Sequence, residues 1–152
     1  MSESDPSAVD PKRLRDIVPH VWPFALFDRV ESFVPQASIT AVKHVSANEP
    51  WLGMPSGQRT HIVPGVLVLE ALLQLGALLV DATSPLRGNI LVHVVGCDHV
   101  RFRGLVQVGD SLDLSVEVLA HDTNMWTMRG AATQRGIPAV GADFVLATVS
   151  SG

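Results

Sequence analysis

The sequence lacks several features that would assign its class at once. Its single cysteine, Cys97, excludes an internal disulfide and a cysteine-based zinc site, and it fits a reducing cytoplasm. We expect Cys97 to be a small core residue. A net charge of −4 argues against a nucleic-acid surface, although a small basic patch remains compatible with it. The polar, acidic residues 1–10 are not expected to act as a signal peptide. With no repeats, charge blocks or linkers, the 152 residues suit one domain with a good-sized core.

The feature that distinguishes the chain is a long apolar run over residues 64–82, PGVLVLEALLQLGALLVDA. Pro64 and Gly65 open it, and proline is well tolerated in a first helical turn. Nearly every later position is Val, Leu or Ala, which predicts a helix that is apolar all round and buried. Its length also suits a membrane span, but Glu70, Gln74 and Asp81 within it, and amphipathic strands around it, favour a core helix. Because an isolated buried charge is very unfavourable, Glu70 must be neutral, partnered or functional.

Strand-like segments lie on both sides of this helix. We expect residues 1–12 to form a flexible tail and residues 13–150 to form one α+β domain. The segment 46–63 is rich in proline, glycine and polar residues, and long ordered loops of this kind are usually functional. Four period-two segments after the helix predict an antiparallel sheet that curls around it. One sheet protects only one side of such a helix, so we expect a homodimer or a higher assembly of dimers.

In this arrangement the chain resembles the hot-dog-fold β-hydroxyacyl-acyl-carrier-protein dehydratases of type II fatty acid synthesis. The resemblance covers roughly residues 14–149, with the motifs in the right order and at nearly the right spacing. The segments that carry it are PHVWPFALFDRV (19–30), NEPW (48–51), PGVLVLEALLQ (64–74), GCDHVRFRGLVQVGDSLDLSVEVL (96–119) and NMWTMRGAATQRGIPAVGADFVLA (124–147). It implies a long central helix wrapped by a curved antiparallel sheet, the hot-dog fold, paired into dimers.

The resemblance also implies chemistry. The family removes water from a β-hydroxyacyl thioester carried on the phosphopantetheine arm of acyl carrier protein, and no cofactor or metal is expected. A loop histidine and the helix glutamate of the partner subunit carry out the proton transfers, and an amide at the helix start polarises the thioester carbonyl. Glu70 matches the glutamate and Gly65 matches the amide donor. Arg101 and Arg103 are candidates for contact with the acidic carrier protein, with Arg59 and Arg129 weaker ones.

The loop before the helix departs from the family pattern. The family reads roughly NEPFFxGHFPGxPVMPG, whereas this chain reads NEPWLGMPSGQRTHIVPG, one residue longer and with no histidine in the GMPSG segment. Ser56 stands fourteen residues before Glu70, where the family has its catalytic histidine, and a serine hydroxyl is a very poor base at neutral pH. His61 is the one histidine of the altered loop and could supply the missing imidazole if the segment 53–63 folds differently.

Other residues near this loop are candidates for substrate contact. Trp51, Met54 and Trp126 could line an acyl tunnel, although core packing is the default for them. Ser56 is a further candidate for substrate contact. Gln74 lies one turn after Glu70 on the same helix face and is expected to satisfy buried polar groups.

Three functions remain open from the sequence. The chain could be a dehydratase that uses Glu70 and a rearranged His61. It could be a non-catalytic subunit that pairs with an active hot-dog dehydratase. It could also be a hot-dog thioesterase, in which one helix carboxylate attacks directly or activates water.

Overall fold

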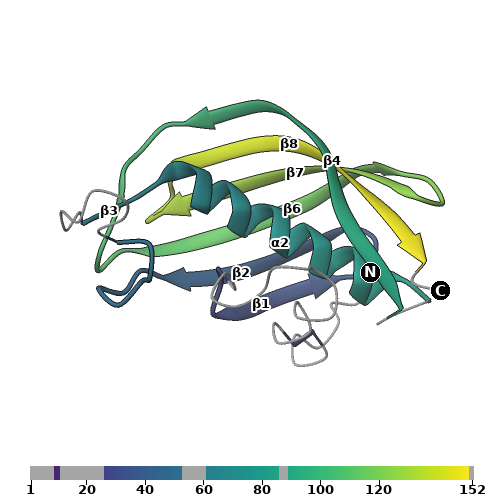
Figure 1. Cartoon of the computed structure of the whole chain (residues 1–152), viewed down its shortest axis with the longest axis horizontal. Helices are drawn as coiled ribbons and strands as arrows, with labels where there is room; N and C mark the ends of the chain where they lie inside the picture. Colours follow the sequence, from purple (N-terminus) through teal and green to yellow (C-terminus); the bar gives the residue numbers. More distant parts are fainter. Residues whose placement is uncertain (1–8, 11–25, 53–60, 86–88, 151–152) are drawn as a thin grey trace.

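The computed structural model describes residues 9–10, 26–52, 61–85 and 89–150. One long helix, α2, lies in the concave side of a curved, six-stranded antiparallel sheet (Figure 1). The strand order is β1-β2-β6-β7-β8-β4. The strands of this sheet are β1 Arg29–Val34, β2 Ser38–His44, β4 Ile90–Phe102, β6 Ser111–His121, β7 Met125–Gln134 and β8 Ile137–Ser150. The predicted α+β fold with a wrapped central helix is confirmed.

Helix α2 runs from Gly65 to Thr83, close to the predicted bounds, and Pro64 precedes it with φ −56° and ψ 131°. Its sequence is long and apolar enough to cross a membrane, with a mean hydropathy of 1.8. Most of it is instead buried against the sheet, and Leu72, Leu75 and Leu78 are fully inaccessible. The helix ends where Ser84 turns extended and its amide bonds back to the Val80 carbonyl. It is the core helix of the domain.

The strands form because small turns join segments whose side chains alternate between core and solvent. In β6 (SLDLSVEVLAH), Leu112, Leu114 and Val116 are buried while the residues between them are exposed. Strands β7 and β8 are joined through Arg135 and Gly136, whose φ values of 51° and 78° are those of a tight two-residue hairpin. The inner faces of these strands pack on α2.

Strand β4 breaks the simple alternation twice, because its register with β8 shifts between Val94 and Gly96 and again between Asp98 and Arg101. At the second bulge His99 has a φ of 52°, a conformation rare outside glycine. The extra residue restores Phe102 to the inner face, opposite Val140, and leaves Arg101 on the outer face, opposite Gly141. The sequence pattern gave no sign of either bulge.

A second, two-stranded sheet was not predicted from the sequence. It pairs β3, Ile62–Val63, with β5, Val106–Gln107. Because β3 leads directly into Pro64 and α2, this pairing fixes the place at which the helix begins. Val9 lies in the segment expected to be a tail, yet its side chain is 2% exposed in the core; the boundary at residue 12 stays a prediction.

The helix approaches the sheet closely where glycines face Phe144. A Cβ on Gly76 of α2 would lie 2.9 Å from Phe144 Cε2 and 3.1 Å from Met128 Sδ, and a Cβ on Gly130 of β7 would lie 3.0 Å from Phe144 Cε1. Phe144 and Met128 are fully buried. Their rings and chains therefore have little room to move, and the two glycines set the distance between helix and sheet.

We predict that Gly76→Ala lowers the free energy of unfolding by about 1–2 kcal/mol, because overpacking outweighs the gain of about 1 kcal/mol in helix propensity. Urea unfolding followed by circular dichroism measures this change. Gly96→Ala is the control, since a Cβ there would meet nothing within 4 Å. A Gly76→Ala protein as stable as the parent would contradict the tight contact.

Candidate functional site

A short hydrogen-bond chain holds Glu70 on the middle of α2. The Gln74 side-chain amide donates to Glu70 Oε1 at 3.1 Å, and Gln74 Oε1 accepts a hydrogen bond from the Leu26 backbone amide at 3.0 Å. Gln74 is 2% exposed, whereas Glu70 is half-buried. The predicted role of Gln74 in satisfying buried polar groups fits this geometry. The carboxylate is thereby oriented at the edge of the core rather than free to rotate.

Beside Glu70 lies a cavity of about 40 Å³, bounded by α2, β4 and β8. Its lining is mostly apolar and includes Leu73, Val94 and Leu146. His93 also borders it, but its register opposite Ala147 puts its side chain on the outer face of the sheet. The cavity has room for water and is far smaller than the few hundred Å³ of an ordinary ligand pocket. Within the described part of one protomer, the substrate-binding volume at Glu70 is incomplete.

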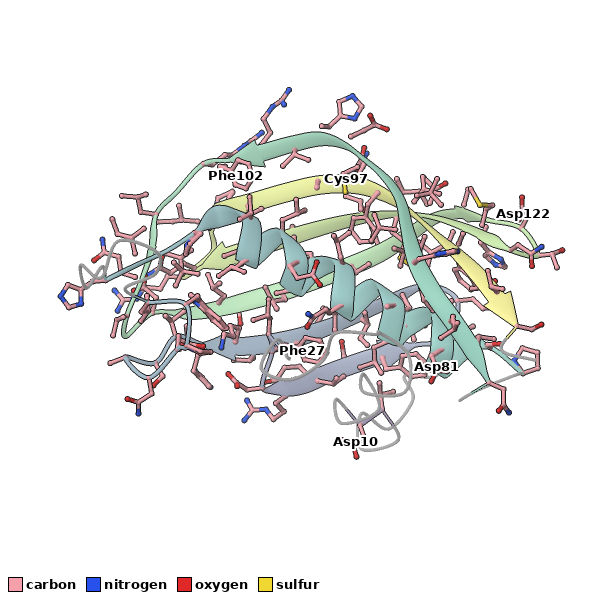
Figure 2. All side chains as sticks on the ribbon, in the orientation of Figure 1. Asp10, Phe27, Asp81, Cys97, Phe102 and Asp122 are labelled. Atoms are coloured by element: carbon pink, nitrogen blue, oxygen red, sulfur yellow. The ribbon has the colours of Figure 1, made fainter. Side chains whose placement is uncertain are left out.

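The first turn of α2 places Gly65 five residues before Glu70, about 7.5 Å along the helix axis. The amides of a first helical turn have no acceptor inside the helix, and they lie at the positive end of the helix dipole. Across from Gly65, Phe102 of β4 lies over the helix start (Figure 2). The sequence had suggested Gly65 for this place but gave no role to Phe102.

His61 lies just before β3, with an exposed side chain, and its carbonyl accepts a hydrogen bond from the Val108 amide at 2.9 Å. The extended residues 62–64 separate it from the helix start, and β3 projects beyond that end of α2 (Figure 1). It does not line the cavity beside Glu70. Ser56 and Met54 fall outside the described residues, as does most of the loop 53–63.

Trp51 lies on the side of α2 away from the Glu70 cavity. It is half-buried and lines a small apolar cavity with Leu67, Ala71 and Leu112. The Lys43 ammonium lies 5.8 Å from the centre of its ring and makes a 2.7 Å ion pair with Glu49, whose side chain is 9% exposed. Glu49 also accepts the Ser46 amide at 3.2 Å. These contacts fix the NEPW motif against the core, a role that sequence reasoning did not assign to Lys43.

The candidate carrier-contact residues lie on the outer, convex face of the sheet. Arg101, Arg103 and Arg129 line a groove of about 410 Å³ together with His99 and Asp143. Arg129 donates to Asp143 at 2.8 Å, and His99 Nδ1 is 3.4 Å from the same carboxylate. The hydrogen bond from Arg129 holds the pKa of Asp143 below its ordinary value and raises the pKa of Arg129. Arg101 and Arg103 therefore carry the positive charge that Asp143 does not neutralise.

Cys97 was expected to be a small core residue, and this expectation is wrong, because the residue is exposed. It lies on β4 where the strand arches over α2 (Figure 2), in register with the inward-facing Phe144. Partial burial raises the pKa of the thiol, and the charges of Asp98 and Glu70 raise it further. The pKa of the Cys97 thiol therefore responds to the charge of Glu70. Among the described residues, no group of three or more His, Cys, Asp or Glu side chains could hold a metal ion.

Comparison with known proteins assigns the family. A family profile described as "FabA-like domain" matches residues 18–140, most of the chain. The chain belongs to this family. This FabA-like chain is 40% identical over 132 residues to the 3-hydroxyacyl-[acyl-carrier-protein] dehydratase FabZ of Sorangium cellulosum, covering 86% of the chain and 84% of that relative. It is 37% identical over 137 residues to the FabZ dehydratase of Haemophilus influenzae, covering 90% and 91%.

Solved structures agree on the fold of this FabA-like chain. The dehydratase heterocomplex ApeI:P from Xenorhabdus doucetiae superposes with a TM-score of 0.75 at 18% identity, covering 92% of this chain and 91% of that one. A hot-dog-like protein from Thermanaerovibrio acidaminovorans superposes with a TM-score of 0.63 at 18% identity, covering 78% and 85%. The family resemblance and the hot-dog fold expected from the sequence are therefore confirmed.

We predict that Glu70→Gln accelerates alkylation of Cys97 by iodoacetamide at pH 8 by about twofold, because removing the carboxylate lowers the thiol pKa and increases the thiolate fraction. Asp98→Asn should have the larger effect, since its charge acts more strongly on Cys97. Glu117→Gln, on the outer face of β6, is the control and should leave the rate unchanged. Mass spectrometry of timed samples measures the rates; equal rates in all four proteins would place Glu70 too far from Cys97.

Proposed function

We propose that this chain acts on 3-hydroxyacyl thioesters carried by acyl carrier protein and removes water from them, with Glu70 as the central acid–base residue. The observation that carries this proposal is the Glu70 carboxylate, held by Gln74 on a mostly apolar helix five residues after Gly65, the first residue of that helix. The FabZ dehydratase relatives, at 35–40% identity over most of the chain, support the same chemistry. We expect the protein to work in the cytoplasm.

Dehydration breaks the Cα–H and Cβ–O bonds of the substrate, forms the Cα=Cβ bond and releases water. It needs a base for the Cα proton, an acid for the departing hydroxyl and a donor for the charge that develops on the thioester oxygen. We assign the acid to the Glu70 carboxyl group and the donor to the Gly65 amide, where the helix dipole favours negative charge. The base is the His61 imidazole of a second copy. Solvent then returns the proton to Glu70 and removes it from His61.

A second copy is required because one protomer leaves the site open. Strand β4 is an edge of the sheet, hydrogen-bonded to β8 on one side. Its apolar side chains Leu91, Val94 and Val95 are 45–57% exposed, and Val66 on the same side of α2 is 63% exposed. An apolar patch on a long edge strand is a surface for association. We infer that two copies meet along β4 and complete the cavity beside Glu70, as a homodimer or within a higher assembly of dimers.

The acyl carrier protein would dock on the outer-face groove. Its acidic surface complements Arg101 and Arg103, whose charge is not neutralised by Asp143. Phe102, between these two arginines, faces inward over the start of α2. Only the edge strand β4 therefore separates a carrier bound at the groove from the Gly65 amide.

One observation favours a second candidate function. Ser56 stands where the family has its catalytic histidine, and in one protomer His61 does not line the Glu70 cavity. A chain without its base would serve as the non-catalytic partner of an active hot-dog dehydratase. The dehydratase heterocomplex of Xenorhabdus doucetiae is a structural neighbour of similar length.

The assay that tests the proposal follows a 3-hydroxyacyl thioester on acyl carrier protein by mass spectrometry, for loss of water and for release of free thiol. We expect enoyl product from the parent chain and a loss of about 10²–10⁴-fold in kcat for Glu70→Gln, because the amide cannot transfer a proton. Asp113→Asn, on the outer face of β6, is the control. Free thiol without enoyl product would identify a thioesterase. No turnover until an active hot-dog chain is added would identify the non-catalytic subunit.

The shared site is tested by mixing two inactive variants. Glu70→Gln and His61→Ala are each expected to be inactive alone. Random mixed dimers would contain one intact site in half of the dimers, so about a quarter of the parent activity should return after subunit exchange. A His61→Ala protein with full activity would show that His61 is not the base. Two inactive variants that do not complement each other would contradict a site built from two copies.

Charge reversal tests the docking groove. We predict that Arg101→Glu with Arg103→Glu raises KM for the carrier-bound substrate by about tenfold and leaves KM for the N-acetylcysteamine thioester unchanged, since only the carrier is acidic. Added salt should weaken the parent in the same direction. Arg29→Glu, on β1 at the opposite edge of the sheet, is the control. An equal change for both substrates would place the arginines outside the docking surface.

A further inference from the structure

We propose that Phe102 is a specificity-determining residue: its ring covers the Gly65 amide in the free protein and moves aside for an acyl chain delivered by a docked carrier. This inference rests on the proposed function, because it takes Gly65 as the donor to the thioester oxygen. It goes further in naming the group that controls access to that donor.

The contact between the ring and the helix start is close. A Cβ on Gly65 would lie 2.5 Å from Phe102 Cδ1 and 2.9 Å from Cε1, so the ring occupies the space that a side chain would fill. The amide nitrogen is one bond away from that Cα. A thioester oxygen must reach within about 3 Å of this nitrogen to accept its hydrogen bond, and the ring occupies part of the approach. A larger residue at position 65 would have to displace the ring.

The ring can move at little cost. Phe102 is 55% exposed, although it lies on the inner face of the sheet. It is the last residue of β4, an edge strand that is hydrogen-bonded to β8 alone within the described chain. A side chain that keeps half of its surface in water loses little apolar burial when it rotates. The fully buried Phe144, by contrast, is held on all sides.

The second bulge of β4 connects this ring to the docking groove. Because His99 adopts a left-handed conformation there, the strand presents Arg101 outward and Phe102 inward. The main chain is anchored just beyond, where the Arg103 amide donates to the Ala139 carbonyl at 2.7 Å. A carrier that binds the guanidinium groups of Arg101 and Arg103 therefore acts on the residues on either side of Phe102. A small thioester in solution makes no such contact.

The first test measures the Gly65 amide itself and needs no substrate. Hydrogen exchange of the ¹⁵N-labelled protein should be about tenfold faster at Gly65 in Phe102→Ala than in the parent, because the ring no longer shields the amide. Phe102→Leu keeps apolar bulk and should lie between the two. Leu119→Ala, an exposed apolar residue of β6, is the control. An unchanged Gly65 exchange rate in Phe102→Ala would overturn the proposal, whatever activity the protein has.

The second test compares substrates. In the parent, kcat/KM should strongly favour the carrier-bound 3-hydroxyacyl chain over its N-acetylcysteamine thioester. In Phe102→Ala this preference should fall about fivefold, mainly because the small thioester gains access. A residue that only supports the fold would change both substrates alike, and that result would overturn the proposal. Failure of the proposed dehydration would appear separately, as a parent protein without enoyl product on either substrate.

Discussion

The structure depends on the need to bury a helix that is apolar around its whole circumference. The sheet covers one side of α2, and the residues that meet it, such as Leu72, Leu75 and Leu78, are fully inaccessible. On the other side Glu70 and the exposed Val66 face β4, where the cover is thin. Burying the helix on one side only therefore leaves the site beside Glu70 incomplete. The Glu70 carboxylate is tolerated at this thinly covered side because the buried Gln74 amide donates a hydrogen bond to it.

In the described chain, the sequence predicted most of the structural features that depend on neighbouring residues in the sequence. The helix bounds, the alternating strands and the position of Glu70 follow from proline, apolar periodicity and an acidic residue in the middle of an apolar run. The family resemblance then supplied the hot-dog fold and its candidate residues, and the FabA-like profile and the FabZ relatives confirm the family.

The remaining features depend on contacts between distant segments. The bulges of β4 exist only relative to the register of β8, and the β3–β5 pair joins residues far apart in the chain. The groove on the outer face gathers Arg101 and Arg129 from different strands, and sequence reasoning had ranked Arg129 low. Cys97 was misjudged for the same reason, since small apolar-like residues are usually buried, and only the edge position of β4 exposes it.

The bulge at His99, rather than the identity of the residues beside it, decides which side chain of β4 serves which face. If β4 kept all its residues but paired one-to-one with β8 beyond Asp98, Arg101 would fall opposite Val140 on the inner face and Phe102 would turn outward. A guanidinium would then lie over the helix start, although neither Arg101 nor Phe102 had been altered. Because two residues of β4 oppose one residue of β8 at the bulge, a relative one residue shorter at this point would pair without a bulge and still present the same two surfaces.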